Sequence, residues 1–175
     1  MDISGIQYNI KYIKKLFLYI KQMVEIAILS ETKTTDINAG TFTSGSWIVR
    51  LLNNLVSNQT TGWISLNTIT GAFTLKSGKY LIQVSAPAVG VNTHQARIHN
   101  TTDNTSIMGS SSLSYALTPS NSSFSIVQGY INITANKTFN IEHFCTKTTL
   151  NFGLGFASGI PGNTEVYTQV TITKL

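Results

Sequence analysis

The apolar residues at the start of the chain follow a strict spacing. Intervals of three and four residues alternate without a break between Ile3, Ile6, Ile10, Ile13, Phe17, Ile20, Val24 and Ala27. This is the heptad pattern of a coiled coil, in which apolar residues at two positions of each repeat face the partner helices. Isoleucine at both positions disfavours two strands and favours three or four. The pattern predicts an α-helical coiled-coil stalk over residues 1–29, with these eight side chains as its trimeric core.

Two other structures fit an amphipathic segment at this place. A single helix packed on its own domain would show a similar apolar stripe, and a basic amphipathic helix could lie on a membrane. The unbroken alternation of three and four favours the coiled coil, and the polar face carries fewer lysines than a membrane-bound helix needs. Residues 30–39, a polar and turn-rich stretch, are then expected to form a linker.

From residue 40 onward the apolar period shortens to two, as in β-strands, and turn signals recur. Within residues 80–86, for example, Tyr80, Ile82 and Val84 share one strand face and Leu81 and Gln83 the other. Strands are expected within 41–52, 62–66, 72–88, 94–100, 106–110, 122–134, 137–147 and 165–175. Because no helical period separates them, the pattern predicts a mostly β protein, with an antiparallel jelly-roll sandwich over residues 40–175.

Charged residues are scarce in this chain, and this limits the kinds of binding partner that the sequence suggests. Charged residues make up 11% of the sequence and the net charge is +5. The basic residues form no cluster with aromatic residues, so a nucleic-acid partner is not expected. A surface of hydroxyls and amides instead suggests burial against other subunits. One cysteine excludes an internal disulfide framework.

Membrane insertion and secretion find no clear signal. No run approaches the roughly 18 apolar residues that span a bilayer. The stretch LFLYI resembles the apolar core of a signal peptide, but Lys21 interrupts it after five residues and no cleavage site follows cleanly. Neither a membrane span nor a signal peptide is therefore expected.

Several short motifs resemble the jelly-roll heads of the tumour necrosis factor and complement globular-head superfamily. They occur in the order GWISL, FTL, SGKYLIQVSAPA, HQARIHNTTD and TEVYTQVTI. The similarity covers about residues 40–175 and is greatest to the branch at the C-termini of phage tail-fibre and large-virus collagen-like proteins. It implies a compact trimer around a three-fold axis that binds ligands without enzymatic activity. Many such proteins carry a Gly-X-Y stalk, which this chain lacks and which the predicted coiled coil would replace.

Residues suited to catalysis are sparse. The only acids after residue 41 are Asp103, Glu142 and Glu165, which lie far apart in sequence, whereas a glycosidase needs two carboxylates flanking one bond. Phosphate-binding loops and nucleophile motifs are also missing. We therefore expect no enzymatic activity and no cofactor.

One pair of residues has the chemistry of metal ligands. His143 and Cys145 lie two residues apart and so share a strand face. A zinc site would need further ligands, such as His94 or His99. The favoured interpretation is a buried cysteine beside a hydrogen-bonded histidine, and no metal site is predicted.

Binding residues are expected on loops, which vary without disturbing the core. The loop at 109–122 offers the aromatic face of Tyr115 and the amide of Asn121, a set that suits a neutral sugar. We predict that these two residues contact a host glycan or surface protein. A second loop, 151–163, is rich in glycine and contains Phe152 and Phe156.

Two residues within strands are expected at contacts between subunits. Arg97 lies on the polar face of its strand, and the resemblance suggests that it hydrogen-bonds across a subunit boundary. Tyr167 is an aromatic residue of the last strand, a type common in cores and interfaces.

These features predict a homotrimeric fibre or spike protein of a phage or large virus, located on the virion surface. A virion protein would anchor the N-terminal helix, and the head would attach to the host. Two alternatives remain open: a capsid-decoration protein without a receptor, and a secreted adhesive protein of the complement-head type. Six glycosylation sequons would matter only in a secretory pathway: Asn58, Asn100, Asn104, Asn121, Asn132 and Asn136.

Overall fold

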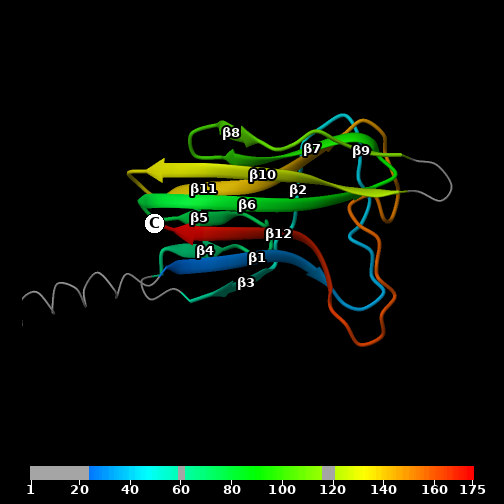
Figure 1. Cartoon of the computed structure of the whole chain (residues 1–175), viewed down its shortest axis with the longest axis horizontal. Coiled ribbons are helices and arrows are strands. Elements are labelled where there is room, and N and C mark those ends of the chain that lie inside the picture. The colour runs from blue at the N-terminus through cyan, green and yellow to red at the C-terminus, as the bar shows by residue number, and fades with distance from the viewer. Residues whose placement is uncertain (1–23, 59–61, 116–120) are drawn as a thin grey trace, which may run out of the picture.

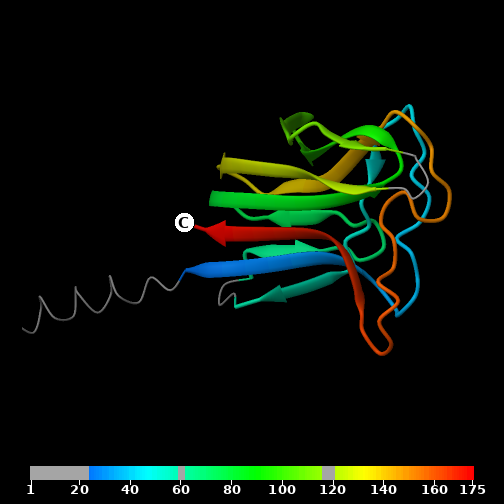
Figure 2. The same ribbon diagram turned by 45° about the vertical axis from the view of Figure 1, so that its right-hand side comes forward.

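The computed structural model describes residues 24–58, 62–115 and 121–175, which form a sandwich of two antiparallel sheets (Figures 1 and 2). One sheet has five strands, in the order β10 (Ser122–Ile133), β6 (Gly78–Val89), β12 (Glu165–Lys174), β1 (Glu25–Lys33) and β3 (Asn54–Ser57). The second sheet has the order β4 (Ile64–Leu66), β5 (Phe73–Leu75), β11 (Lys137–Cys145), β7 (Asn92–Asn100) and β8 (Thr105–Met108). Two short strands complete it: β2 (Ile48–Val49) pairs with β11, and β9 (Ser112–Ser114) pairs with β7.

The strands follow from the alternation of buried and exposed side chains. In β7, His94, Ala96 and Ile98 point into the sandwich while Gln95 and Arg97 point away from it. Asparagine tolerates the left-handed backbone that tight turns require. Asn92 and Asn104 adopt it, with φ of 61° and 54°, at the turns before β7 and β8.

The interior contains two separate clusters of apolar side chains. The main core fills the space between the sheets and includes Leu29, Trp63, Phe73, Phe139 and Ile172. A smaller satellite cluster consists of Ala39, Phe42, Ala88, Val91, Cys145, Leu154 and Tyr167. A small cluster buries less apolar surface than a large one. Opening the segments that this cluster holds together therefore costs less free energy than opening the main core.

Strand β1 corrects the expected boundary of the N-terminal helix. Residues 25–33 form an interior strand between β12 and β3. Ala27 is buried in the main core, whereas Val24, which directly precedes the strand, is exposed. The segment is apolar at consecutive positions, so a spacing of three and four can be traced through a strand that is apolar on both faces. The predicted helix therefore does not extend to residue 29, and residues 30–33 are not a linker. The remaining stalk positions lie outside the described residues: Ile3, Ile6, Ile10, Ile13, Phe17 and Ile20.

The expected antiparallel sandwich is confirmed, and β4 to β8 and β10 to β12 fall within the expected regions to within about two residues. The region 41–52 is different, because only β2 and a bridge between Phe42 and Thr149 are strand-like there. It crosses the end of the sandwich and buries Arg50. No helix among the described residues is long and apolar enough to cross a membrane.

The two ends of the sandwich differ in what they carry (Figures 1 and 2). Glu25, where β1 begins, and the C-terminus lie at one end, which we call the terminal end. The long connections 34–47 and 146–164 lie together at the opposite end, which we call the loop end. Any chain that precedes β1 therefore joins the sandwich at the end away from these connections.

Candidate functional site

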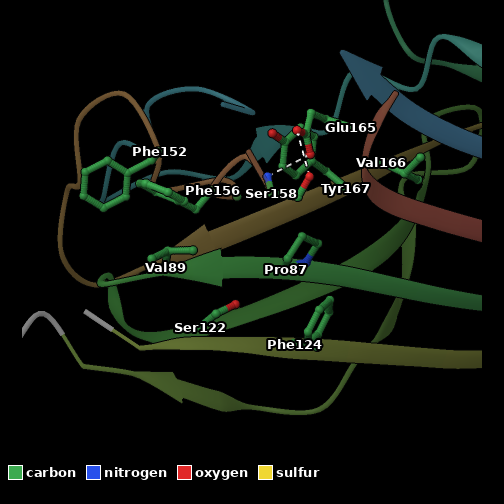
Figure 3. A pocket seen from close by; sticks show the side chains of 11 residues that line it. Pro87, Val89, Ser122, Phe124, Phe152, Phe156, Ser158, Glu165, Val166 and Tyr167 are labelled. Atoms are coloured by element: carbon green, nitrogen blue, oxygen red, sulfur yellow. Dashed lines mark hydrogen bonds between the residues drawn. The ribbon is translucent and has the colours of Figure 1, made fainter. Parts of the chain in front are cut away.

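A pocket of about 580 Å³ opens at the loop end, between the outer face of the five-stranded sheet and the glycine-rich segment 151–163 (Figure 3). Strands β6 and β10 supply Pro87, Val89, Ser122 and Phe124. The start of β12 and the glycine-rich segment supply Phe152, Gly155, Phe156, Ser158, Glu165, Val166 and Tyr167. The site thus joins a rigid sheet surface to a long connection.

Aromatic rings make up much of the pocket wall. Phe152 and Phe156 meet edge to face, with ring centroids 5.5 Å apart, and Phe156 is 64% exposed. Gly155 lies against the Tyr167 ring, and a Cβ added there would collide with that ring. Glycine therefore allows the segment to pass closely over Tyr167. The exposed ring of Phe156 suits an apolar or sugar-like ligand.

Glu165 fixes the segment that forms one side of the pocket. Its carboxylate accepts hydrogen bonds from the Ser158 backbone N–H at 2.9 Å, the Ser158 hydroxyl at 3.0 Å and the Asp36 backbone N–H at 3.4 Å. These bonds, above all that from the Ser158 N–H, lower the pKa of Glu165. A carboxylate held charged by several donors is a poor general base, so its role here is to anchor the segment.

The predicted loop residues lie beside this pocket. Tyr115 is 52% exposed, and Asn121 directly precedes Ser122 of the pocket wall. The backbone N–H of Asn121 donates to the Tyr115 carbonyl at 3.4 Å, and the Asn121 carbonyl accepts from the Ser114 hydroxyl at 2.6 Å. The structure therefore brings these two exposed residues together, and their contact with a ligand stays a prediction.

The residues expected between subunits make their polar contacts within one chain. Arg97 forms an ion pair with Glu142, with Nη2 to Oε2 at 2.6 Å, and its guanidinium lies 4.1 Å from the centre of the Trp47 ring. Tyr167 is buried in the satellite cluster, and its hydroxyl donates to the Ile37 carbonyl at 2.7 Å. Burial raises the pKa of Tyr167 to about 12. Tyr167 is thus buried within its own chain, and a role for Arg97 or Tyr167 between subunits stays a prediction.

The histidine and cysteine pair has the structural form that the sequence favoured. Cys145 is fully buried, and its thiol donates to the Lys147 carbonyl, with Sγ to O at 3.3 Å. Burial raises the pKa of this thiol to about 11. His143 hydrogen-bonds to His94, whereas His99 bonds to Ser106. Within the described part of the chain, no three potential ligands lie close enough to hold a metal ion.

The outer face of the five-stranded sheet is a second unusual surface. Three rows of cross-strand neighbours carry no charged side chain, and we call them the uncharged face. The pairing places in these rows Tyr130, Leu81, Thr173 and Ile26; Gln128, Gln83, Thr171, Ile28 and Val56; and Ile126, Ser85, Gln169, Ser30 and Asn54. Leu81 and Tyr130 are 49% and 53% exposed. The pocket adjoins this face through Pro87 and Phe124, which pair across β6 and β10.

The uncharged face was not predicted from the sequence, although β10 contains a signal for it. Phe124, Ile126 and Tyr130 lie on one side of this strand, and Val127 and Ile131 lie on the other. A strand that is apolar on both sides needs cover on both sides. The buried pair Glu31 and Arg50 was also missed, because only the fold brings these two residues together.

No family model matches the chain, and no curated protein matches it. Among solved structures, that of murine APRIL at pH 8.5 is 11% identical, covers 87% of this chain and 99% of its own, and has a TM-score of 0.50. The chain therefore shares its antiparallel jelly-roll sandwich fold with murine APRIL. Two other solved structures are similar. Eiger TNF from S. frugiperda is 11% identical, covers 87% of this chain and 92% of its own, and has a TM-score of 0.49. The globular domain of the zebrafish complement 1qA protein is 13% identical, covers 87% of this chain and 95% of its own, and has a TM-score of 0.46.

Proposed function

We propose that this protein is a homotrimeric, non-catalytic attachment head on the surface of a phage or large-virus particle. The observation that carries the proposal is the uncharged face. Large exposed apolar patches on a soluble domain mark interaction sites, and charge depletion is typical of the centre of an interface. A second copy of the same chain is a suitable partner, because its own uncharged face is also exposed.

The number of subunits follows from the N-terminal pattern. Isoleucine at both core positions of the predicted coiled coil favours three or more helices over two. Identical subunits around a closed axis leave none of their contact surfaces unpaired. We therefore infer a trimer in which the sheets pack together and the predicted stalk holds the subunits in register.

The separation of the two ends supports a role in attachment. The chain before β1 joins the terminal end, and the pocket, Tyr115 and Asn121 lie around the loop end. An anchor at the terminal end would therefore present the loop end outward. In a trimer built on the uncharged face, the adjoining pocket would lie close to a subunit boundary.

The acidic side chains support a non-catalytic role, because their partners are structural. Four of them form ion pairs: Glu31 with Arg50, Glu142 with Arg97, Asp103 with Lys137, and Glu25 with Lys174. Glu165 anchors the glycine-rich segment. Carboxylates engaged in this way are not poised as a pair around a substrate bond.

The assembly is tested by placing one charge in the centre of the uncharged face. Gln83→Lys is expected to convert the trimer to folded monomers, since three unpaired charges would be buried on assembly. Ser65→Lys, at an exposed position of β4 in the other sheet, is the matched control and is expected to remain trimeric. Light scattering gives the mass and circular dichroism confirms the fold. A monomeric wild type, or a Gln83→Lys variant that stays trimeric, would contradict the proposal.

A further inference from the structure

We propose that the loop end is an acid-sensitive latch, in which protonation of the buried pair His94 and His143 releases the glycine-rich segment and the start of β10 while the main core stays folded. The two imidazoles lie on β7 and β11, whose backbones pair antiparallel. His94 Nδ1 and His143 Nε2 are 2.9 Å apart, and His94 Nε2 is 2.8 Å from the Ser123 hydroxyl of β10. This inference is independent of the proposed attachment function.

The hydrogen-bond pattern defines where an added proton would go. His143 Nδ1 is buried and has no hydrogen-bond partner among the described residues. A buried N–H without an acceptor is costly, so in the favoured tautomer Nδ1 of His143 carries no proton. Nε2 of His143 then donates to His94, and Nε2 of His94 donates to Ser123. An added proton binds Nδ1 of His143, where it creates a buried, unpaired N–H on a cation.

The charges around the pair oppose this protonation. Arg50 is the nearest cation, and its own counter-ion, Glu31, already pairs with it at 2.7 Å. On the two paired strands, Arg97, His99 and Glu142 lie on the face opposite to the pair. The titratable groups of the adjoining satellite cluster are Cys145 and Tyr167, whose pKa values of about 11 and 12 keep them neutral at physiological and acidic pH. A proton on the pair therefore adds a positive charge that no carboxylate balances.

The same groups hold the loop end together. Arg50 donates from Nη1 to the Pro87 carbonyl at 3.2 Å and from Nη2 to the Leu154 carbonyl at 2.8 Å. These bonds fix β6 and the glycine-rich segment at the pocket, while the bond from His94 to Ser123 fixes β10. A charge on His143 repels the Arg50 guanidinium and so opposes the contacts that Arg50 makes.

The sign of the effect follows from the pKa shifts. Burial, and then the charge of Arg50, lowers the pKa of His94 to about 4, and the same causes lower that of His143 well below its usual value. Each histidine, once released to water, binds protons near pH 6.5, so the open state takes up more protons than the closed one. The closed state is therefore fully favoured above pH 6.5 and loses its advantage as the pH falls toward 4.

The size of the effect is large enough to measure. With a pKa of about 4 when closed and about 6.5 when open, His94 alone raises the opening equilibrium constant about 30-fold between pH 7.5 and pH 5. Because the satellite cluster is small, this opening precedes unfolding of the main core.

Hydrogen exchange of the full chain at pH 7.5 and pH 5, corrected for intrinsic rates, tests the latch. Opening of residues 151–158 and 122–125 is expected to increase about 30-fold or more, while β12 near Ile172 stays protected. The double variant His94→Gln, His143→Gln is expected to lose this increase. His99→Gln is the matched control, because His99 lies on the same strand but points outward, and it should behave like the wild type.

A titration of the wild-type histidines by NMR keeps the test decisive if the double variant does not fold. His94 and His143 are expected to stay neutral until the loop end opens. The proposal is overturned if His94 and His143 titrate near pH 6.5 in the closed protein. It is equally overturned if exchange increases uniformly over both sheets, or if His99→Gln abolishes the increase.

Discussion

At the scale of single residues, the buried ion pair between Glu31 and Arg50 connects parts of the chain that lie far apart in the sequence. Arg50 is fully buried and Glu31 nearly so, and Nε and Nη2 of Arg50 lie 2.8 and 2.7 Å from Oε2 of Glu31. Nη1 and Nη2 also donate to two backbone carbonyls, those of Pro87 and Leu154. In a chain with only 11% charged residues, this pair connects β1, β6 and the glycine-rich segment at a place that apolar packing alone does not fill.

Replacing one member of this pair is expected to be costly. Arg50→Met leaves Glu31 buried without its partner and frees the two carbonyls, so we expect the free energy of unfolding to fall by about 3–5 kcal/mol. Urea denaturation at pH 7.5 measures the change.

The matched control removes a cation of similar length from a more exposed pair. Lys137→Met breaks the pair with Asp103, which is 41% exposed, and should cost less than about 1 kcal/mol. Equal losses in the two variants would show that burial does not set the cost of breaking these pairs.

At the scale of elements, β1 determines where the folded head begins. It pairs with β12 from Glu25 to Lys33 and with β3 through Ala27 to Ser30. It also supplies Leu29 to the main core. A head that started at residue 40 would therefore lack an interior strand as well as Glu31.

Two truncations test this boundary. A chain of residues 24–175 is expected to give the circular dichroism of a β protein and a cooperative unfolding transition. A chain of residues 40–175 is expected to be unfolded or aggregated, because β12 would have an unpaired edge and β3 no partner. A cooperative transition with an unchanged midpoint in the shorter chain would contradict the role of β1.

At the scale of the whole molecule, the arrangement of the two ends governs what a partner can reach. The pocket wall, Tyr115 and Asn121 surround the loop end, and the turn 134–136 between β10 and β11 lies at the opposite end. Residues at the loop end come from parts of the sequence that lie far apart. A ligand that bound there would therefore contact a surface that exists only in the folded head, and not one continuous peptide.

Substitutions at the loop end test whether it binds a host surface. The double variant Tyr115→Ala, Asn121→Ala is expected to reduce binding to host cells or to a glycan array at least tenfold, because an aromatic face and the neighbouring amide are removed together. Asn136→Ala, in the turn at the terminal end, is the control and should bind like the wild type. Unchanged binding by a folded, trimeric double variant would exclude this loop, and binding by no form of the protein would favour a decoration role.

Much of the head could be predicted from local pattern. In β7, for instance, Ala96 and Ile98 alternate with Gln95 and Arg97, and this alternation alone assigns the buried face. The segment 25–33 could not be assigned in this way, because Ile26, Ala27, Ile28 and Leu29 are all apolar. A continuous apolar run suits a helix or an interior strand equally, and only the partners on both sides decide between them.

The sequence by itself determined that the chain is a charge-poor antiparallel β protein, because side-chain alternation and turn residues act locally. The tertiary structure decided which groups come together across long separations: Glu31 pairs with Arg50, His94 pairs with His143, and Phe124 lines one pocket with the glycine-rich segment. These contacts depend on strand order and on the path of long connections, which short-range periodicity does not encode. The candidate site, the latch and the uncharged face therefore became visible only when the sheets were assembled.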